Sequence, residues 1–395
     1  MEIGIDKIGF FAPHMYVDMT NLAVARGVEP EKFTIGIGQS QMAVAPITQD
    51  PVTLAANAAL EILDEEDRAQ IDMVLFGTES GIDNSKSAAV YVHHLLGLKA
   101  EARAVELKQA CYGATAGIQL AKGHIALHPE SKVLVLGSDI ARYGLKTSGE
   151  STQGAGAVVM VISAAPRILA LDNDNAFLSN DIMDFWRPIY SEQAFVDGKF
   201  SNEQYVHFFN EVWKQYKEKT GNDLADFEAI CFHLPYTKMG WKALRTELPN
   251  ADESTQERLK ANYQISTAYN RNIGNIYTGS LYLSLLSLLE QKEDLQAGAK
   301  IGLFSYGSGA VGEFFTGTLQ PGFQRMLKKT DHENLFATRR ELTVAEYEKI
   351  FEETLPKDGS TIELDIESDP AAICVAGMQD NKRLYINKEH LIEQK

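Results

Sequence analysis

Cysteine and positive charge are both scarce in this chain. Its 395 residues include only 3 cysteines, too few for a disulfide framework and typical of a protein from a reducing compartment. Lysine and arginine together number 37 against 54 aspartate and glutamate residues, which gives a formal net charge of -17. Because binding to a phosphate backbone requires a basic surface, this balance excludes nucleic acid from the expected partners.

Long apolar runs and cofactor-binding motifs are missing as well. The first residues, MEIGIDKIGFF, carry acidic side chains where a signal peptide carries basic ones, and runs such as GAGAVVMVI are too short to cross a bilayer. The sequence contains no Cys/His spacing typical of zinc and no Walker loop. We therefore expect a cytoplasmic protein without a membrane segment, a bound metal or a resident cofactor.

Short apolar runs alternate with helical patterns along the chain. The runs DMVLFG, KVLVLGS, AVVMVIS, AICFH and IGLFSYG predict buried strands. The stretches VTLAANAALEILDEED, AAVYVHHLLGL and SLYLSLLSLLEQK predict helices, and the acidic run 64–67 is expected at the solvated end of the first. This alternation indicates an α/β fold with helices on both faces of a sheet.

Parts of the sequence occur twice in the same order. The stretch TQGAGAVVMVIS is echoed by SYGSGAVGEFFTG, DMVLFGTES by EAICFHLPY, and ACYGATAG by GNIYTGS. One Gly-rich match between strand ends arises easily by chance, but three ordered matches do not. We therefore predict a duplicated α/β unit.

The duplication assigns four polar residues to strand ends and helix starts, where α/β folds bind ligands. They are Glu79, Cys111, His233 and Asn275. Each has a structural alternative: a loop carboxylate, a core thiol, a buried histidine and a helix cap. Together they supply what thioester chemistry needs. Unpaired N–H groups and the dipole of the helix that begins near Cys111 are expected to lower the pKa of its thiol.

Four longer motifs resemble one enzyme family. ELKQACYGATAGIQLA, CFHLPYTKMGWKAL, NIGNIYTGSLYLSL and SYGSGAVGEFF are similar to the 3-hydroxy-3-methylglutaryl-CoA (HMG-CoA) synthases of the thiolase superfamily, particularly the bacterial branch. The resemblance runs to about residue 320 and implies a thiolase-like fold, two α/β halves in a five-layered αβαβα arrangement. The halves would span 1–166 and 167–395, with an insertion at about 167–227 beside the active site and a C-terminal extension from about 321.

The resemblance also implies a reaction. Cys111 would take an acetyl group from acetyl-CoA, Glu79 would remove a methyl proton, and His233 would polarise and protonate the ketone of acetoacetyl-CoA. Water would then release HMG-CoA, an intermediate of isoprenoid biosynthesis by the mevalonate pathway. Six further positions match substrate-contacting residues of the family: Tyr143, Thr152, Asp184, Ser201, Asn275 and Ser308.

Coenzyme A carries phosphates, so an acidic protein that binds it needs a local basic feature. Lys238 and Lys242 lie four residues apart, with Arg245 nearby and His233 just upstream, and are expected to contact CoA. Cys231 and Cys374 lie in apolar runs and are predicted to be core residues. Members of the superfamily are commonly dimers, and the helix around 85–98 is the predicted interface.

Two other functions remain open on the sequence. An initiating ketoacyl carrier-protein synthase shares a Cys–His–Asn set on the same fold, but its decarboxylating reaction needs no base for a methyl proton, so Glu79 favours the HMG-CoA synthase. A catalytically silent, thiolase-like acyl-CoA-binding protein is the second alternative, and the complete set of nucleophile, base and acid argues against it.

Overall fold

The apolar runs of the sequence form the strands of the protein. In order they are β1 (Ile3–Phe11), β2 (Met15–Asp18), β3 (Gln41–Val44), β4 (Ile71–Gly77), β5 (Arg103–Leu107), β6 (Lys132–Ala141), β7 (Gly154–Ala164), β8 (Leu169–Leu171), β9 (Ala176–Ser179), β10 (Phe185–Trp186), β11 (Phe195–Val196), β12 (Ala229–Phe232), β13 (Lys300–Gly307), β14 (Val311–Leu319), β15 (Arg340–Leu342), β16 (Ile362–Glu363), β17 (Ile373–Gln379) and β18 (Lys382–Asn387). All five predicted strands are confirmed, as β4, β6, β7, β12 and β13.

The helices follow the predicted periodicity. They are α1 (Met19–Ala25), α2 (Pro51–Ile62), α3 (Glu65–Gln70), α4 (Ala88–Leu95), α5 (Gly113–Leu127), α6 (Gly198–Thr220), α7 (Met239–Glu247), α8 (Glu253–Ser266), α9 (Ala268–Ile273), α10 (Ser280–Gln291), α11 (Lys329–Thr338) and α12 (Val344–Glu352). The stretch predicted as one long helix from residue 52 is two, because α2 ends at Ile62 and the Asp64 side chain caps a new helix, α3.

One order of strand pairing occurs twice in the central sheet. This computed structural model describes residues 1–191 and 193–388, and its main sheet has ten strands in the order β12-β13-β14-β8-β1-β7-β6-β4-β5, with β9 beside β14. In the first half β4 runs parallel to β6, β6 antiparallel to β7, and β7 antiparallel to β1. In the second, β12, β13, β14 and β8 pair in the same directions. The predicted duplication is confirmed.

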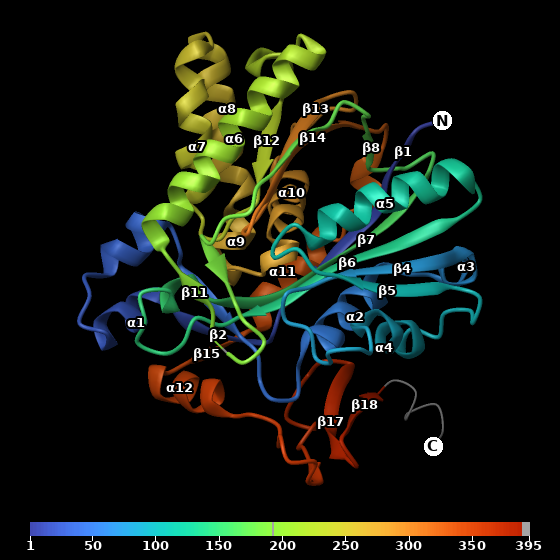
Figure 1. The fold of residues 1–395 in the computed structure, drawn as a ribbon, viewed down its shortest axis with the longest axis vertical. Coiled ribbons are helices and arrows are strands. Elements are labelled where there is room, and N and C mark those ends of the chain that lie inside the picture. Colours follow the sequence, from blue (N-terminus) through green and yellow to red (C-terminus); the bar gives the residue numbers. More distant parts are fainter. Residues whose placement is uncertain (192, 389–395) are drawn as a thin grey trace.

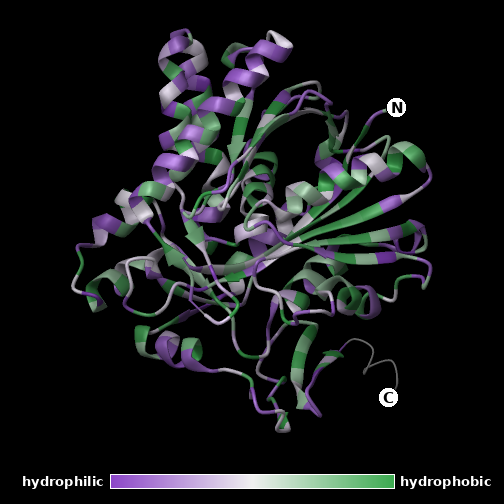
Figure 2. Cartoon of the chain, in the orientation of Figure 1, coloured by the Kyte–Doolittle hydropathy of each residue, from purple (hydrophilic) through white to green (hydrophobic). Residues whose placement is uncertain are grey.

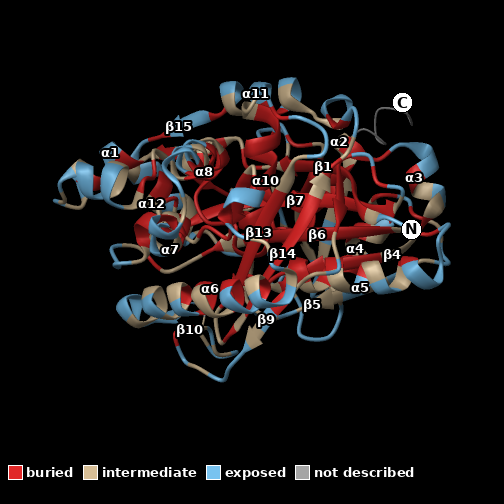
Figure 3. Cartoon of the chain, turned by 90° about the horizontal axis from the view of Figure 1, so that it is seen from above, coloured by how far each residue is buried: buried red, intermediate tan, exposed pale blue. Residues whose placement is uncertain are grey.

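The buried side chains divide the molecule into five layers. A first apolar cluster joins α2 and α4 to one face of β4, β6 and β7. A second joins the opposite face of those strands to α5 and α10, and also to the inner face of β12 and β13. A third joins the outer face of β12, β13 and β14 to α6 and α7. The order is therefore helices, sheet, helices, sheet, helices, as the αβαβα prediction states (Figures 1 and 3).

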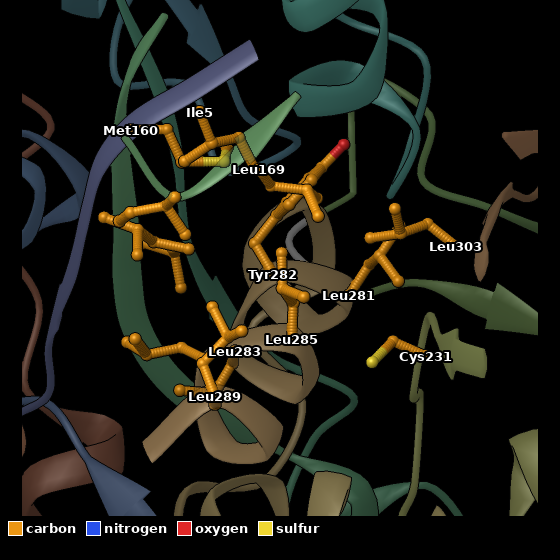
Figure 4. Close-up of a cluster of buried hydrophobic side chains, with 14 of the residues drawn as sticks. Ile5, Met160, Leu169, Cys231, Leu281, Tyr282, Leu283, Leu285, Leu289 and Leu303 are labelled. Atoms are coloured by element: carbon orange, nitrogen blue, oxygen red, sulfur yellow. The ribbon is translucent and has the colours of Figure 1, made fainter. Parts of the chain in front are cut away.

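Helix α10 fills the middle layer. Its residues are buried on every side, as the continuous apolar sequence predicts for a helix between two sheets. Figure 4 shows Leu281, Leu283 and Leu285 of this helix between side chains of the two sheet halves, with Cys231 of β12 in the same cluster. The prediction that Cys231 is a core residue is confirmed, and Cys374 of β17 is likewise fully buried. Apolar colour accordingly follows the central strands in Figure 2.

The second half contains the two segments that the sequence set apart. The segment 167–227 begins with β8, a strand of the central sheet, and continues through β9, the β10–β11 hairpin and α6. After residue 321 the chain returns to the first half, where β15 pairs with β2 and Ile373 of β17 exchanges hydrogen bonds with Asn57 of α2. Residue 192 of the predicted insertion and residues 389–395 of the predicted second half lie outside the described residues.

Candidate active site

Cys111 lies in a sharp turn between β5 and α5. The residue before it, Ala110, has a positive φ of 43°, and α5 begins two residues after it. The turn packs directly on the end of β4: a Cβ on Gly77 would lie 2.4 Å from the amide nitrogen of Ala114, so only glycine fits there. This close approach puts the residues that follow β4 beside the thiol.

The Cys111 thiol donates a hydrogen bond to the side chain of Glu79. The distance from Sγ to Oε1 is 3.0 Å, and the Cys111 residue is only 9% exposed. The loop that carries Glu79 is also restrained by the segment that follows β10, because the guanidinium of Arg187 donates a hydrogen bond to the Glu79 backbone carbonyl. The sequence placed both residues near strand ends and a helix start, and the structure brings them into direct contact.

The pKa of the Cys111 thiol is raised well above its ordinary value, contrary to the sequence prediction. Burial is the largest cause, and the charge of Glu79 and its hydrogen bond add to it. These effects outweigh the N-terminus of α5. Burial also raises the pKa of Glu79, to about 8, and the charge of Asp139 raises it further. The two groups therefore hold their protons more tightly than usual, and because they are in contact they titrate as a coupled pair.

Asp139 is a site residue that the sequence reasoning missed. It lies on β6, is fully buried, and accepts hydrogen bonds from the Glu79 amide at 2.8 Å and from the Thr78 hydroxyl at 2.8 Å. Its second oxygen accepts from the amide and hydroxyl of Thr278, at 3.1 and 2.6 Å. One carboxylate thus joins the Glu79 loop of the first half to the start of α10 in the second. The only signal was a carboxylate inside the apolar run LGSDIA.

His233 follows the last residue of β12 and is 3% exposed. Its Nδ1 atom has no hydrogen-bond partner among the described residues, and its carbonyl accepts from the Tyr205 hydroxyl at 2.6 Å. Burial lowers the pKa of His233 to about 3, so the imidazole is neutral near pH 7. The Tyr205 ring lies 6.5 Å from the His233 ring.

Asn275 presents its amide nitrogen to an aromatic group beside Cys111. Its Oδ1 atom accepts from the Tyr277 amide at 2.8 Å and from the Ser280 hydroxyl at 3.0 Å, which leaves Nδ2 to donate to the Tyr143 hydroxyl at 3.4 Å. Tyr143 and Tyr277 pack with Cys111 in one small apolar cluster. The structure therefore places Tyr143 and Asn275 beside the thiol.

Asp184 organises the side of the site that belongs to the predicted insertion. It is fully buried and accepts hydrogen bonds from the Tyr306 hydroxyl at 2.8 Å, the Gly309 amide at 2.9 Å and the Ser201 hydroxyl at 3.3 Å. Ser308 lies in the same turn, and its carbonyl accepts from Gln109, two residues before Cys111. Asp184, Ser201 and Ser308 therefore lie close together.

Thr152 ends the short 3₁₀ turn Glu150–Thr152, two residues before β7. Its hydroxyl donates to the Gly149 carbonyl at 2.9 Å within its own turn. Gly154, two residues later, bridges to Gly274, next to Asn275. The backbone near Thr152 is thus paired with the backbone next to Asn275. The Thr152 hydroxyl itself bonds only within its own turn among the contacts described.

The predicted basic cluster forms at the start of α7. Lys238 is the residue before the helix, and Lys242 lies within it. The ammonium of Lys242 donates to the Tyr236 hydroxyl at 2.7 Å. Burial lowers the pKa of Lys242, and the charges of Arg245 and Lys238 lower it further. The three cations lie five to twelve residues after His233 in the chain.

Two expected absences concern membranes and metals. Over residues 1–191 and 193–388, no helix has both the length and the apolar content needed to cross a membrane. Within the same ranges, no group of three or more His, Cys, Asp and Glu side chains is arranged to hold a metal ion.

Comparison with known proteins adds sequence and structural relatives. Family models for the hydroxymethylglutaryl-coenzyme A synthase N terminal and C terminal regions match residues 1–166 and residues 173–262 and 250–358. The hydroxymethylglutaryl-CoA synthase of Enterococcus faecalis is 57% identical over 374 residues, covering 94% of this chain and 98% of the relative. A crystal structure of an HMG-CoA synthase complexed with CoA has a TM-score of 0.95 at 46% identity, covering 98% of this chain and 100% of that one. A structure of MvaS in complex with 3-hydroxy-3-methylglutaryl coenzyme A has a TM-score of 0.88 at 36% identity, covering 98% and 99%.

The duplicated αβαβα fold, with the buried Cys111 thiol hydrogen-bonded to the Glu79 carboxylate near its strand ends, defines a thiolase-like condensing enzyme. The matches to both family models and to the Enterococcus enzyme extend over most of the chain. The chain belongs to the hydroxymethylglutaryl-coenzyme A synthase family.

Proposed function

We infer that this enzyme condenses acetyl-CoA with acetoacetyl-CoA and water to form HMG-CoA and free CoA, through an acetyl group carried on Cys111. The observation that carries this inference is the 3.0 Å hydrogen bond between the Cys111 thiol and Glu79, in a member of this family. A base beside the nucleophile is what condensation from an acetyl thioester requires. The reaction is a step of the mevalonate pathway of isoprenoid biosynthesis.

The first step transfers acetyl from sulfur to sulfur. The Cys111 thiol gives its proton to Glu79, its sulfur attacks the carbonyl carbon of acetyl-CoA, and the CoA sulfur leaves and takes that proton from Glu79, which is then ionised again for the next step. Because the pKa of the thiol is raised, an adjacent proton acceptor favours its ionisation, and Glu79 is in contact with it. The N–H groups at the start of α5 stabilise the negative charge that forms on the carbonyl oxygen.

The second step forms the carbon–carbon bond. Glu79 removes a proton from the methyl group of acetyl-Cys111, and the resulting enolate attacks the ketone carbon of acetoacetyl-CoA. A buried carboxylate with a pKa of about 8 is a strong enough base for this proton once ionised. His233 polarises the ketone oxygen as a neutral N–H donor and protonates it as the bond forms. Hydrolysis of the Cys111 thioester then releases HMG-CoA.

Other predicted residues bind the substrates. Asn275 directs its amide N–H groups toward the thioester of the second substrate, and Tyr143 borders the same space. The acyl chain of the substrate is contacted by four further residues, or by groups that they position: Thr152, Asp184, Ser201 and Ser308. Lys238, Lys242 and Arg245 bind the phosphates or the pantetheine amides of CoA. The CoA thioesters are substrates, and we propose no separate cofactor.

The two alternatives differ from this reaction at Glu79. A ketoacyl carrier-protein synthase obtains its carbanion by loss of carbon dioxide, so a carboxylate in contact with the thiol would have no methyl proton to remove. A silent acyl-CoA-binding protein would have no need for a hydrogen-bonded thiol and carboxylate, or for a histidine whose Nδ1 lacks a partner among the described residues.

We also propose that the protein is cytoplasmic and forms a homodimer. Each chain would consist of two halves, 1–166 and 167–395. The sheet ends at β5, which is paired on one side only in the described part of the chain. Val105 of β5 and Val90 of α4 are 46% and 41% exposed, so this edge offers apolar surface to a second copy. The predicted interface helix, 85–98, contains α4.

The direct test mixes the purified enzyme with acetyl-CoA and acetoacetyl-CoA and measures product by mass spectrometry. We expect HMG-CoA and one free CoA for each acetyl group consumed, and no product from Cys111→Ser. Turnover of acetyl-CoA with a malonyl carrier protein, with release of carbon dioxide, would instead identify the ketoacyl synthase. Retention of CoA thioesters without turnover would identify the silent binding protein.

A further inference from the structure

The C-terminal segment reaches the active site through one buried tyrosine. Tyr347 lies on α12, beside β15 in Figure 1, and is 1% exposed. Its hydroxyl accepts a hydrogen bond from the Gln153 amide nitrogen at 2.8 Å and donates to Glu150 at 3.2 Å. Both partners belong to the first half of the fold, in the connection between β6 and β7 that also carries Tyr143.

Gln153 passes this contact on to the backbone of Tyr143. Its side-chain oxygen accepts from the Tyr143 amide at 2.7 Å and from the Gly144 amide at 3.1 Å. These two bonds fix which way the Gln153 amide group points, so its buried nitrogen must find an acceptor, and Tyr347 is that acceptor. Gly144 has a positive φ of 100°, so the chain reverses immediately after Tyr143 at the point that Gln153 holds.

Charged groups hold α12 in place. Arg26, the residue after α1, binds Glu150 through two nitrogens, at 2.8 and 2.7 Å, and binds Glu348 of α12 at 2.7 Å. A bidentate pair of this kind sets direction as well as distance. A capping box between Thr343 and Glu346 fixes the start of the helix. The Tyr347 hydroxyl is therefore presented to Gln153 by a helix that is itself restrained.

The last residue in this series of contacts, Tyr143, lies in the active site. The Tyr143 ring packs against Phe185 and Tyr277, with centroids 5.8 and 6.1 Å apart, in the cluster that contains Cys111. Its hydroxyl accepts from Asn275. A shift of the Tyr143 backbone would move this hydroxyl relative to Asn275 and the thiol, and misplacement by about 1 Å is enough to slow a positioned reaction severely.

We propose that Tyr347 and Gln153 are positioning residues: through them, α12 sets the place of Tyr143 in the active site. The catalytic part of this proposal rests on the substrate-binding role proposed above for Tyr143. The C-terminal segment, to which the sequence assigns no role, thus holds the Tyr143 backbone in place through Gln153.

The test compares Tyr347→Phe with Tyr385→Phe in the full-length enzyme. Tyr385 lies in the same C-terminal segment, and its hydroxyl donates to Asp50, the cap of α2, at 2.7 Å. Both variants therefore lose one hydroxyl bonded to the first half, but only Tyr347 contacts Gln153. Hydrogen–deuterium exchange measures the Tyr143 and Gly144 amides, and steady-state kinetics with both CoA substrates measures function.

In Tyr347→Phe we expect exchange at the Tyr143–Gly144 peptide to rise about tenfold, since a buried bond that fixes it is lost. We expect kcat/KM for acetoacetyl-CoA to fall about tenfold, with KM changed more than in Tyr385→Phe. In the background of Tyr143→Phe, the added effect of Tyr347→Phe should shrink, because both changes act on one group. Tyr385→Phe should change neither readout.

Equal exchange and equal kinetics in the two variants would overturn the proposal. So would effects of Tyr347→Phe and Tyr143→Phe that multiply as independent changes. The exchange measurement needs no turnover, so it tests the link from α12 to Tyr143 even if the wild-type enzyme makes no HMG-CoA. That last result would contradict the proposed function, and unchanged kinetics in Tyr143→Phe would contradict only the role of Tyr143.

Discussion

Replacing Glu79 with glutamine separates acetyl transfer from carbon–carbon bond formation. The substitution keeps the size of the side chain and removes its charge. In the structure, both the charge of Glu79 and its hydrogen bond raise the pKa of the Cys111 thiol. A neutral amide therefore makes the Cys111 thiolate easier to form, and this offsets the loss of the proton acceptor in the first step. We expect Glu79→Gln to form the acetyl-Cys111 adduct.

Condensation should suffer far more in the same variant. It requires removal of a proton from a methyl group, and a positioned base contributes at least about 100-fold to such a step. A loss of that size corresponds to about 2.7 kcal/mol in activation free energy, at about 1.36 kcal/mol for each tenfold change. Glu106→Gln is the matched control: Glu106 lies on the neighbouring strand β5 and accepts from the Ala88 amide, and it should leave condensation near the wild-type rate.

The assay follows the two steps separately. Mass spectrometry measures the acetyl group on Cys111 after incubation with acetyl-CoA, and HMG-CoA formation measures condensation. Exchange of the acetyl methyl protons with deuterated solvent reports proton removal and should fall in parallel with product. If Glu79→Gln instead lost the adduct and kept methyl exchange in the remaining acetyl-enzyme, Glu79 would serve only to activate the thiol. The base would then have to be another group, with His233 the first to test.

Three further expectations concern pH, the basic cluster and stability. Because burial raises the pKa of Glu79 to about 8, the condensation rate should rise about tenfold between pH 7 and 9 as the base ionises, and a flat profile of kcat would contradict this. Lys242→Ala should raise KM for the CoA substrates, more at low salt, with kcat less affected. Lys199→Ala, which changes an exposed side chain, should leave KM unchanged. An unchanged KM in Lys242→Ala would mean that Lys242 does not contact CoA. Burial lowers the pKa of His332, but the pairs with Glu290 and Glu61 outweigh it and raise the pKa from 6.5 to about 9. The contribution of His332 to stability is therefore full below pH 6.5 and is lost as the pH rises through 9. His332→Gln should therefore lower the free energy of unfolding by up to about 3 kcal/mol more at pH 6 than at pH 10, in denaturant titrations, and equal losses at both pH values would refute the ion pair.

The architecture was predictable because it is encoded locally. Each central strand is a short apolar run ended by glycine or a polar residue, and α10 is rich in leucine because it is buried between the two halves of the sheet. The repeat then placed Glu79 and His233 after equivalent strands and Cys111 and Asn275 before equivalent helices. Position relative to a strand end is a property of the sequence nearby, so these four residues could be assigned to strand ends and helix starts.

What the sequence missed depends on contacts between distant segments. The sign of the Cys111 pKa shift is set by burial and by a carboxylate from another loop, and neither is visible in the helix start that follows the thiol. The acidic run 64–67 was expected in solvent, yet Asp67 is fully buried because Lys7 and Lys132 approach it at 2.5 and 2.7 Å. Asp139 looks like one polar residue in an apolar strand, and its role appears only where the two halves meet.

The most direct test of the account is to incubate the enzyme with acetyl-CoA alone and map the modified peptide. The account predicts one acetyl group on the peptide that contains Cys111, and none in Cys111→Ser, which should also be inactive. The two other thiols are buried in the core, and the pKa of each is raised to about 12, so neither should react. An acetyl group on Cys231 or Cys374, or product formation by Cys111→Ser at the wild-type rate, would contradict the central claim that Cys111 carries the acetyl group.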